Sequence, residues 1–227
     1  QLEERSCRLA SWLQNKGVKK GDRVAILIHN CTEVFELEFA CAKIGAIELP
    51  LNWRLTKPEL EYILNDSSPE VLIYGSNFED IAESLLKDCS IKNSLEIDDE
   101  DQNNEYEQAL RKNIDFDVVE TTHDDLIMLM YTSGTTGHPK GAMITHEMQF
   151  YNIVNLAGSS RVTDKTVQLI VLPLFHTGGM NCYANPILHY GGQIVLMKEF
   201  DPGKALEIID DPDYGITHFF AVPAPFQ

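Results

Sequence analysis

The sequence predicts an α/β protein with layered, mainly parallel sheets flanked by helices. Short apolar runs alternate with amphipathic helical segments along most of the 227 residues. Strands that are joined through helices run parallel and are covered on both faces. Capping residues and glycines mark the helix boundaries in the same alternating order. The length suits one large domain or two modest ones.

The helical segments of the first half share an apolar stripe and a capping or stop residue. The first carries its stripe up to Leu13 and ends at Gly17. Asn30, with Glu33 three residues later, is predicted to cap the second helix, which Gly45 ends. Two further helices are predicted from the capping signatures Thr56–Glu59 and Ser76–Glu79.

The predicted strands are apolar runs that lie between these helices and continue through the second half. They cover residues 23–29, 46–50, 70–74, 126–130, 167–174, 191–197 and 217–222. Helices of the second half are predicted from near Thr145, between Gly179 and Tyr190, and from Asp201 to Ile209. From Glu96 to Glu107 the alternation fails, and the acidic run Asp98–Asp101 predicts a solvated loop.

The composition limits the classes of partner. The chain has 18 Lys and Arg against 35 Asp and Glu, a net charge of −17, which disfavours nucleic acid and anionic membranes as partners. Five cysteines without a CxxC pair are expected to be small buried residues in a reducing, cytoplasmic protein. No apolar run approaches the roughly 20 residues that span a bilayer, and no signal peptide is visible.

The segment Tyr131-Thr-Ser-Gly-Thr-Thr-Gly-His-Pro-Lys-Gly141 combines four hydroxyl side chains, three glycines and a lysine. Glycines let backbone N–H groups turn toward one point, and such a concavity binds anions. Hydroxyls add short donors, and lysine adds a compact charge that suits phosphate. The spacing differs from the P-loop and from the dinucleotide fingerprint. The residues therefore predict a polyphosphate-binding loop of another type, with a plain strand-to-helix turn as the structural alternative.

This segment resembles the AMP-binding signature of the adenylate-forming enzymes, which include acyl-CoA synthetases, peptide-synthetase adenylation domains and luciferases. Residues 21–26 and 39–46 resemble the early strand-helix region of that family. Leu172–Gly179 resembles its next motif, in the form common among fatty and aromatic acyl-CoA synthetases. Gly191–Gly192 and Val222–Pro223 also stand where the family has them, so the resemblance covers nearly the whole chain.

The resemblance implies a two-step reaction. A carboxylate attacks the α-phosphate of ATP to give an acyl-adenylate and pyrophosphate, and a thiol, usually that of coenzyme A, then displaces AMP. Preorganised donors stabilise the charge that develops on pyrophosphate, and Mg²⁺ accompanies ATP without a metal ligand expected within this chain. The phosphate-binding residues that the resemblance implies are Thr132, Ser133, Gly134, Thr135, Thr136, Gly137 and Lys140.

His176 is the candidate catalytic residue. Gly178 and Gly179 follow it and allow a ligand to approach closely. By resemblance, His176 lies beside the reacting carboxylate and the thiol's entry path, with Thr177 and Gly178 in the acyl pocket or thiol tunnel. It would orient the acyl group or gate the tunnel, and not act as a general base. The structural alternative is a strand-end histidine that is hydrogen-bonded in the core.

Later motifs of the family are not found in these residues. A Gly-Tyr-Gly-x-Thr-Glu adenine motif, a Thr-Gly-Asp ribose motif and a C-terminal domain with its catalytic lysine are absent from the sequence. The chain also begins at Gln1 within a helical pattern. We therefore expect an incomplete N-terminal large domain of the acyl-CoA synthetase fold, inactive by itself. Residues 1–165, with the loop at 131–141, would form a first subdomain, and 166–227 the start of a second.

The expected function of the full-length protein is the activation of a fatty or related hydrophobic acid to its acyl-CoA. The enzyme alternatives are an aryl- or succinylbenzoate-CoA ligase and an amino-acid adenylation domain. The Phe175-His176-Thr177-Gly-Gly form favours CoA ligases over amino-acid activation. The non-enzyme alternative is a nucleotide-binding relative without ligase activity. The particular acid and the oligomeric state are not predicted.

Overall fold

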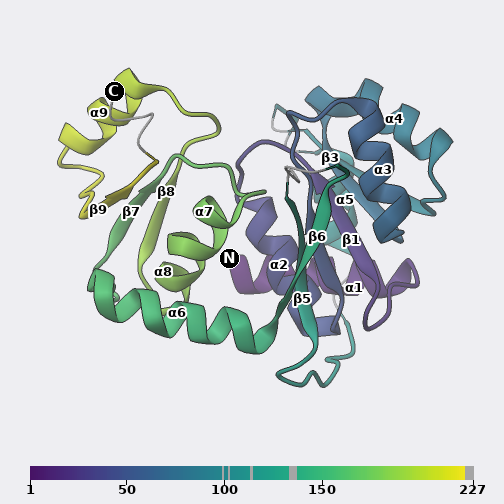
Figure 1. Cartoon of the computed structure of the whole chain (residues 1–227), viewed down its shortest axis with the longest axis horizontal. Coiled ribbons are helices and arrows are strands. Elements are labelled where there is room, and N and C mark those ends of the chain that lie inside the picture. The colour runs from purple at the N-terminus through teal and green to yellow at the C-terminus, as the bar shows by residue number, and fades with distance from the viewer. Residues whose placement is uncertain (99, 102, 113–114, 133–136, 223–227) are drawn as a thin grey trace. The chain divides into compact units, whose positions relative to one another are not determined.

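Two units can be distinguished in the computed structural model (Figure 1). It describes residues 1–98, 100–101, 103–112, 115–132 and 137–222. Unit 1 comprises Gln1–Ile28 and Glu33–His146, and unit 2 comprises His29–Thr32 and Glu147–Gln227. This division falls earlier than the expected subdomain start at residue 166, because the helix that begins at His146 packs with later residues of unit 2.

Unit 1 is built on a six-stranded sheet with the order β4-β3-β1-β2-β5-β6. All neighbours run parallel except β6, which is antiparallel to β5, so the predicted mainly parallel sheet is confirmed. The sequence did not predict β4 or β6, because both are edge strands whose exposed residues interrupt the apolar pattern. The strands are β1 (Arg23–Leu27), β2 (Ile47–Pro50), β3 (Val71–Gly75), β4 (Asn93–Ile97), β5 (Leu126–Thr132) and β6 (Lys140–Thr145).

Helices cover both faces of this sheet. The connection from β1 to β2 and the one from β2 to β3 run in opposite directions, so right-handed crossovers place their helices on opposite faces. Ala25 and Leu27 pack against α3 and α4, while Val24 and Ile26 point to the other face and are equally buried. The helices are α1 (Leu2–Asn15), α2 (Glu33–Ile44), α3 (Lys57–Ser67), the 3₁₀ turn η1 (Ser76–Phe78), α4 (Glu79–Asp88) and α5 (Glu105–Lys112).

The acidic segment is more structured than predicted. Its first residues end strand β4 at Ile97, and its last residues begin helix α5 at Glu105. Tyr106 is buried, with 1% of its surface exposed, and its hydroxyl donates to Glu36 at 2.7 Å. The predicted solvated loop is therefore wrong at both ends, since Tyr106 gives the segment an apolar residue to bury.

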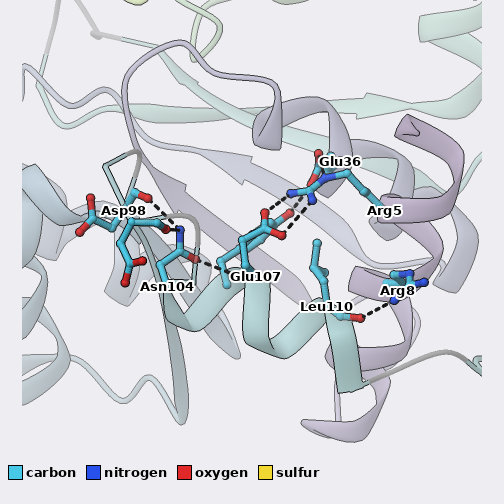
Figure 2. Close-up of polar contacts among 9 residues, drawn as sticks. Arg5, Arg8, Glu36, Asp98, Asn104, Glu107 and Leu110 are labelled. Carbon is cyan, nitrogen blue, oxygen red and sulfur yellow. Dashed lines mark hydrogen bonds and ion pairs between the residues drawn. The ribbon is translucent and has the colours of Figure 1, made fainter.

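An ion-pair network fixes α5 against α1 and α2. Figure 2 shows Arg5 of α1 between Glu36 of α2 and Glu107 of α5. The Arg5 guanidinium donates to Glu36 at 2.5 Å and to Glu107 at 2.6 and 3.1 Å. Asn104 precedes α5, accepts from the Glu107 N–H at 2.9 Å and donates to the Asp98 carbonyl at 2.8 Å. These contacts replace the apolar burial that the acidic run lacks.

The predicted caps behave differently from one another. Ser76 does not cap α4, because it begins the 3₁₀ turn η1 and the N-cap of α4 is Phe78, which makes no side-chain capping bond. Thr56 forms the predicted capping box with Glu59, whose carboxylate accepts from the Thr56 N–H at 2.8 Å. Asn30 does not cap α2, which begins at Glu33. Its side-chain amide binds backbone groups within unit 2 instead. A polar residue that follows a strand can therefore bond to backbone groups distant in the sequence and not cap the following helix.

The core of unit 1 contains a carboxyl group without a hydrogen-bond partner. Glu48 on β2 is fully buried, and neither of its carboxyl oxygens is hydrogen-bonded to any described residue. Burial raises the pKa of Glu48 well above its usual range, and the nearby carboxylate of Glu38 raises it further. The neutral, protonated form of Glu48 is therefore favoured in the folded protein.

Unit 2 contains a parallel three-stranded sheet with the order β8-β7-β9. Its strands are β7 (Val167–Ile170), β8 (Gln193–Leu196) and β9 (His218–Phe220). Its helical segments are α6 (His146–Ser160), α7 (Thr177–Gly179), the π-helix η2 (Met180–Ala184), α8 (Asn185–His189) and α9 (Pro202–Asp210). Asp201 caps α9 by accepting from the Lys204 N–H at 2.8 Å. In the described part of the chain, no helix has the length and apolar character needed to cross a membrane.

Candidate functional site

The glycine-rich segment connects the two strands of a β-hairpin in unit 1. Thr132 of β5 pairs directly with Lys140 of β6, and Tyr131 pairs with Gly141. The Thr132 hydroxyl also donates to the Lys140 carbonyl at 3.4 Å. The alternative of a plain strand-to-helix turn is therefore wrong, because β6 separates the segment from the helix that begins at His146.

The described residues of this segment place a cation next to an exposed hydroxyl. Thr132, Gly137 and Lys140 are exposed, and Gly137 has a φ of +146°, a conformation that favours glycine. Among the residues that the structure describes, no carboxylate pairs with Lys140. An exposed ammonium without a carboxylate partner is suited to an anionic ligand. The other predicted phosphate-binding residues lie outside the described residues: Ser133, Gly134, Thr135 and Thr136.

Two contacts with helix α3 hold the base of the hairpin. The ring of His138 stacks on Tyr62, with 4.5 Å between the ring centroids and 16° between the planes. The Tyr131 hydroxyl donates to the carboxylate of Asp66. Burial and this hydrogen bond raise the pKa of Tyr131, so its hydroxyl stays protonated and remains a donor at neutral pH. The loop thus extends from a fixed base.

His176 lies in unit 2, between the carboxyl end of β7 and helix α7. It is exposed, which argues against the alternative of a core histidine. Its Nδ1 accepts from the backbone N–H of Gly178 at 3.2 Å and so caps α7. A neutral His176 with this bond carries its proton on Nε2. The ring is therefore oriented by its own cap and can donate from Nε2.

The two glycines after His176 have different surroundings. A Cβ at Gly178 would meet its nearest atoms at 3.4 and 3.5 Å, which is ordinary contact. A Cβ at Gly179 would lie 2.3 Å from the carbonyl oxygen of Pro173 and 2.7 Å from that of Leu172. Close packing against this turn therefore explains Gly179, without the ligand approach that the sequence suggested.

Two asparagines that were not predicted as site residues contact this motif. The side-chain amide of Asn30 hydrogen-bonds with Leu172, Leu174 and Met197, at the carboxyl ends of β7 and β8. Asn181, in the π-helix, donates to the Thr177 hydroxyl at 3.4 Å. The sequence predicts Asn30 as the cap of the following helix, which is wrong, because its side chain bonds to these backbone groups. Nothing in the spacing around Asn181 predicts a π-helix.

The predicted site residues thus form two groups. Thr132, Gly137 and Lys140 lie together in unit 1, and His176, Thr177 and Gly178 lie together in unit 2. The first group lies at the carboxyl end of β5, and the second follows the carboxyl end of β7. Open α/β sheets bind ligands at the carboxyl ends of their parallel strands. The first group suits a phosphate, and the second offers a hydrogen-bond donor beside a close-packed turn.

The sequence matches proteins of known activity. A family profile described as AMP-binding enzyme matches residues 1–227. A feruloyl-CoA synthase of an Amycolatopsis species is 35% identical over 227 residues, which cover 100% of this chain and 44% of the relative. The long-chain-fatty-acid–CoA ligase FadD13 of Mycobacterium tuberculosis (strain H37Rv) is 32% identical over 209 residues, which cover 92% of this chain and 41% of the relative.

The fold matches solved structures as well. The crystal structure of ATP-bound MatB from Rhodopseudomonas palustris superposes with a TM-score of 0.89 at 28% sequence identity. The match covers 99% of this chain and 44% of that chain. The 227 residues therefore span less than half the length of the two sequence relatives and of the MatB chain named here.

Proposed function

The chain belongs to the AMP-binding enzyme family, and we propose that the full-length protein is an ATP-dependent acid–thiol ligase. In the first step a carboxylate oxygen attacks the α-phosphorus of ATP, the bond to the bridging oxygen breaks, and pyrophosphate leaves. In the second step the sulfur of coenzyme A attacks the acyl carbon, and AMP leaves. The observation that carries this proposal is the family match over the whole chain, with the Tyr131–Gly141 signature on a hairpin that presents an exposed Lys140.

The hairpin segment is proposed to hold the β- and γ-phosphates of ATP. Thr132 and Lys140 are the paired strand residues that flank this segment, and they would supply a hydroxyl and an ammonium group. Ser133, Thr135 and Thr136 would add hydroxyl donors. Backbone N–H groups of Gly134 and Gly137 would complete the cradle. Donors fixed before the reaction stabilise the charge that develops on pyrophosphate. Mg²⁺ would accompany ATP and help to neutralise the charge of its phosphates.

His176 is proposed to orient the acyl group. Because its Nδ1 accepts from the Gly178 N–H, its Nε2–H is available to donate to a carboxylate or acyl oxygen. A donor in this place positions the acyl carbon without removing a proton. Thr177 and Gly178 would line the acyl pocket or the thiol tunnel. This assignment agrees with an orienting role and not with a general base.

A fatty or related hydrophobic acid is the proposed substrate class. The relatives named above are a feruloyl-CoA synthase and a long-chain-fatty-acid–CoA ligase, whose acids are both largely apolar. An aryl-CoA ligase is therefore the nearest enzyme alternative, followed by a succinylbenzoate-CoA ligase and an amino-acid adenylation domain. The cysteines of the chain are free thiols, which agrees with a cytoplasmic enzyme.

The test uses the full-length protein and a panel of acids. Acid-dependent exchange between ATP and labelled pyrophosphate measures the first step, and CoA-dependent AMP release measures the second. A panel of fatty acids, ferulate, succinylbenzoate and amino acids distinguishes the alternatives, and we expect the fastest turnover with a hydrophobic acid. ATP binding without exchange for any acid would favour the non-enzyme alternative and would contradict the proposed function.

A further inference from the structure

We propose that Asn30 is a positioning residue: it holds the turn at Leu172–Leu174, and this turn sets the position from which His176 orients the acyl group. This inference rests on the proposed function, since it assigns a task to a residue outside both predicted groups. Asn30 is separated from His176 by more than a hundred residues in the sequence, yet it belongs to the same unit. Its side chain contacts the backbone just before His176 and just after β8.

The side-chain amide of Asn30 makes three hydrogen bonds, two through Nδ2 and one through Oδ1, and all three are to backbone atoms. Its Nδ2 donates to the carbonyl oxygen of Leu172 at 3.0 Å and to that of Met197 at 3.1 Å. Its Oδ1 accepts from the Leu174 N–H at 2.9 Å. Only 8% of the Asn30 surface is exposed, so water does not readily replace these bonds.

These bonds begin where the sheet ends. The Met197 N–H donates to the Ile170 carbonyl at 3.0 Å and continues the pairing of β7 with β8. Beyond it, Pro173 has no N–H to donate. The side chain of Asn30 supplies two donors and one acceptor to the backbone at this point. Aspartate has no donor and serine has a single hydroxyl, so neither reproduces the pattern.

The segment held by Asn30 leads directly to His176. The Pro173 carbonyl accepts from the His176 N–H at 3.2 Å. Gly179 packs on the same turn so closely that a Cβ there would lie 2.3 Å from the Pro173 carbonyl oxygen. The turn at Leu172–Leu174 is thus held by Asn30 and by Gly179, and His176 lies in the chain between this turn and Gly179. Loss of the Asn30 bonds would free one support of the histidine.

The neighbouring His29 offers a matched control. Its Nε2 lies 2.9 Å from a carboxylate oxygen of Glu199, so it also ties residues 29–32 to the chain after β8. It is adjacent to Asn30 in the sequence and lies in the same unit. His29→Gln removes this imidazole–carboxylate contact and leaves the Asn30 amide in place. A general loosening of residues 29–32 would affect both variants, whereas positioning of His176 requires Asn30.

The experiment measures steady-state kinetics of the full-length protein with the best acid of the panel. We expect Asn30→Ala to lower kcat about tenfold, with the KM for ATP within about twofold of wild type. His29→Gln should change kcat by less than about twofold, because a contact with an exposed carboxylate contributes little. In a His176→Ala background, Asn30→Ala should add less than about twofold, because residues that act through one another are not additive. If Asn30→Ala proves unstable, Asn30→Ser, which keeps one donor, takes its place.

Hydrogen exchange of the full-length protein separates this inference from the proposed function. We expect faster exchange at the amides of Leu174 and Gly178–Met180 in Asn30→Ala, a result that does not depend on catalysis. If wild type shows no acid-dependent exchange of pyrophosphate while these amides are loosened, the proposed function fails and the positioning contact stands. Unchanged amides, or an equal loss of kcat with and without His176, would overturn the inference.

Discussion

Lys140 is the residue on which the electrostatics of the hairpin depend. The protein carries a net charge of −17, so an anionic ligand needs a local cation. Lys140 is exposed, lies opposite Thr132, and has no carboxylate partner among the described residues. By contrast, Lys20 and Lys57 are already paired with Asp125 and Asp88.

Removal of the Lys140 charge should therefore impair the first step of the proposed reaction. We expect Lys140→Ala in the full-length protein to lower acid-dependent pyrophosphate exchange by about 10- to 100-fold, the range for loss of one charge-stabilising donor. Lys87→Ala is the matched control, because Lys87 is an exposed lysine of unit 1 on α4. Equal exchange rates in Lys140→Ala and wild type would remove the proposed role of Lys140.

The buried carboxyl of Glu48 predicts a dependence of stability on pH. A glutamate in an unfolded chain has a pKa of about 4.3. In the folded protein, burial and the nearby Glu38 raise the pKa of Glu48. Its contribution is fully present below the unfolded pKa and is lost as pH rises through the folded pKa. Because glutamine does not ionise, Glu48→Gln should flatten the decline of stability with rising pH from pH 5 to 8. Thermal unfolding across this range measures it.

The exposed Glu4 provides the control for this measurement. It lies on α1, and Glu4→Gln removes a surface carboxylate that pairs with Arg8 in the adjacent turn. We expect the stability of Glu4→Gln to depend on pH as that of wild type does, because exposed ion pairs contribute little to stability. A Glu48→Gln profile parallel to that of wild type would contradict the assignment of a protonated, buried Glu48.

At the scale of elements, helix α7 and the preceding turn form one packed piece. α7 is only three residues long, Thr177–Gly179, and continues directly into the π-helix Met180–Ala184. It keeps its place through the His176 cap and through the contact of Gly179 with the Pro173 turn. A π-helix is an uncommon element that is often found at functional sites.

Substitution of Gly179 should disrupt this piece. In Gly179→Ala the added methyl group would lie 2.3 Å from the Pro173 carbonyl oxygen, so the backbone must shift. We expect a loss of about 1–3 kcal/mol in the free energy of unfolding, as for an overpacked core. Gly158→Ala on α6 is the control, because its Cβ would meet no atom within 4 Å and helical alanine is favoured. Unfolding in urea compares them, and an unchanged midpoint for Gly179→Ala would refute the packing argument.

Much of the fold was predictable at this scale, because buried parallel strands and capped helices leave local patterns. The apolar runs of β1, β2, β3 and β5 and the capping box at Thr56 are such patterns. Strands β4 and β6 were missed, since exposed residues interrupt their apolar pattern and their place in the sheet depends on pairing with β3 and β5, which local spacing does not reveal. Asn30 was assigned to the wrong partner for the same reason, because local spacing cannot reveal the carbonyls of Leu172 and Met197.

At the scale of the whole molecule, the chain spans less than half the length of the feruloyl-CoA synthase and of the FadD13 ligase that it matches. It covers 44% of ATP-bound MatB, and the adenine and ribose motifs expected from the family resemblance are absent from its sequence. We expect the 227 residues alone to give no acid-dependent pyrophosphate exchange, while the full-length protein does. Circular dichroism of the 227-residue chain in the assay buffer would establish that it is folded under the conditions of the exchange assay. Robust exchange by the shorter chain would contradict this expectation.

The pairing of Thr132 with Lys140 limits how the hairpin can vary in length. Residues directly opposite in an antiparallel pair share one face, so the hydroxyl of Thr132 and the ammonium of Lys140 extend to the same side. A one-residue slip in the pairing of β5 with β6 would turn one of the two to the other face or bulge the strand. A single-residue insertion or deletion inside β5 or β6 that shifts this register should therefore be less tolerated than a substitution there, since it separates the cation from the hydroxyl without altering either residue.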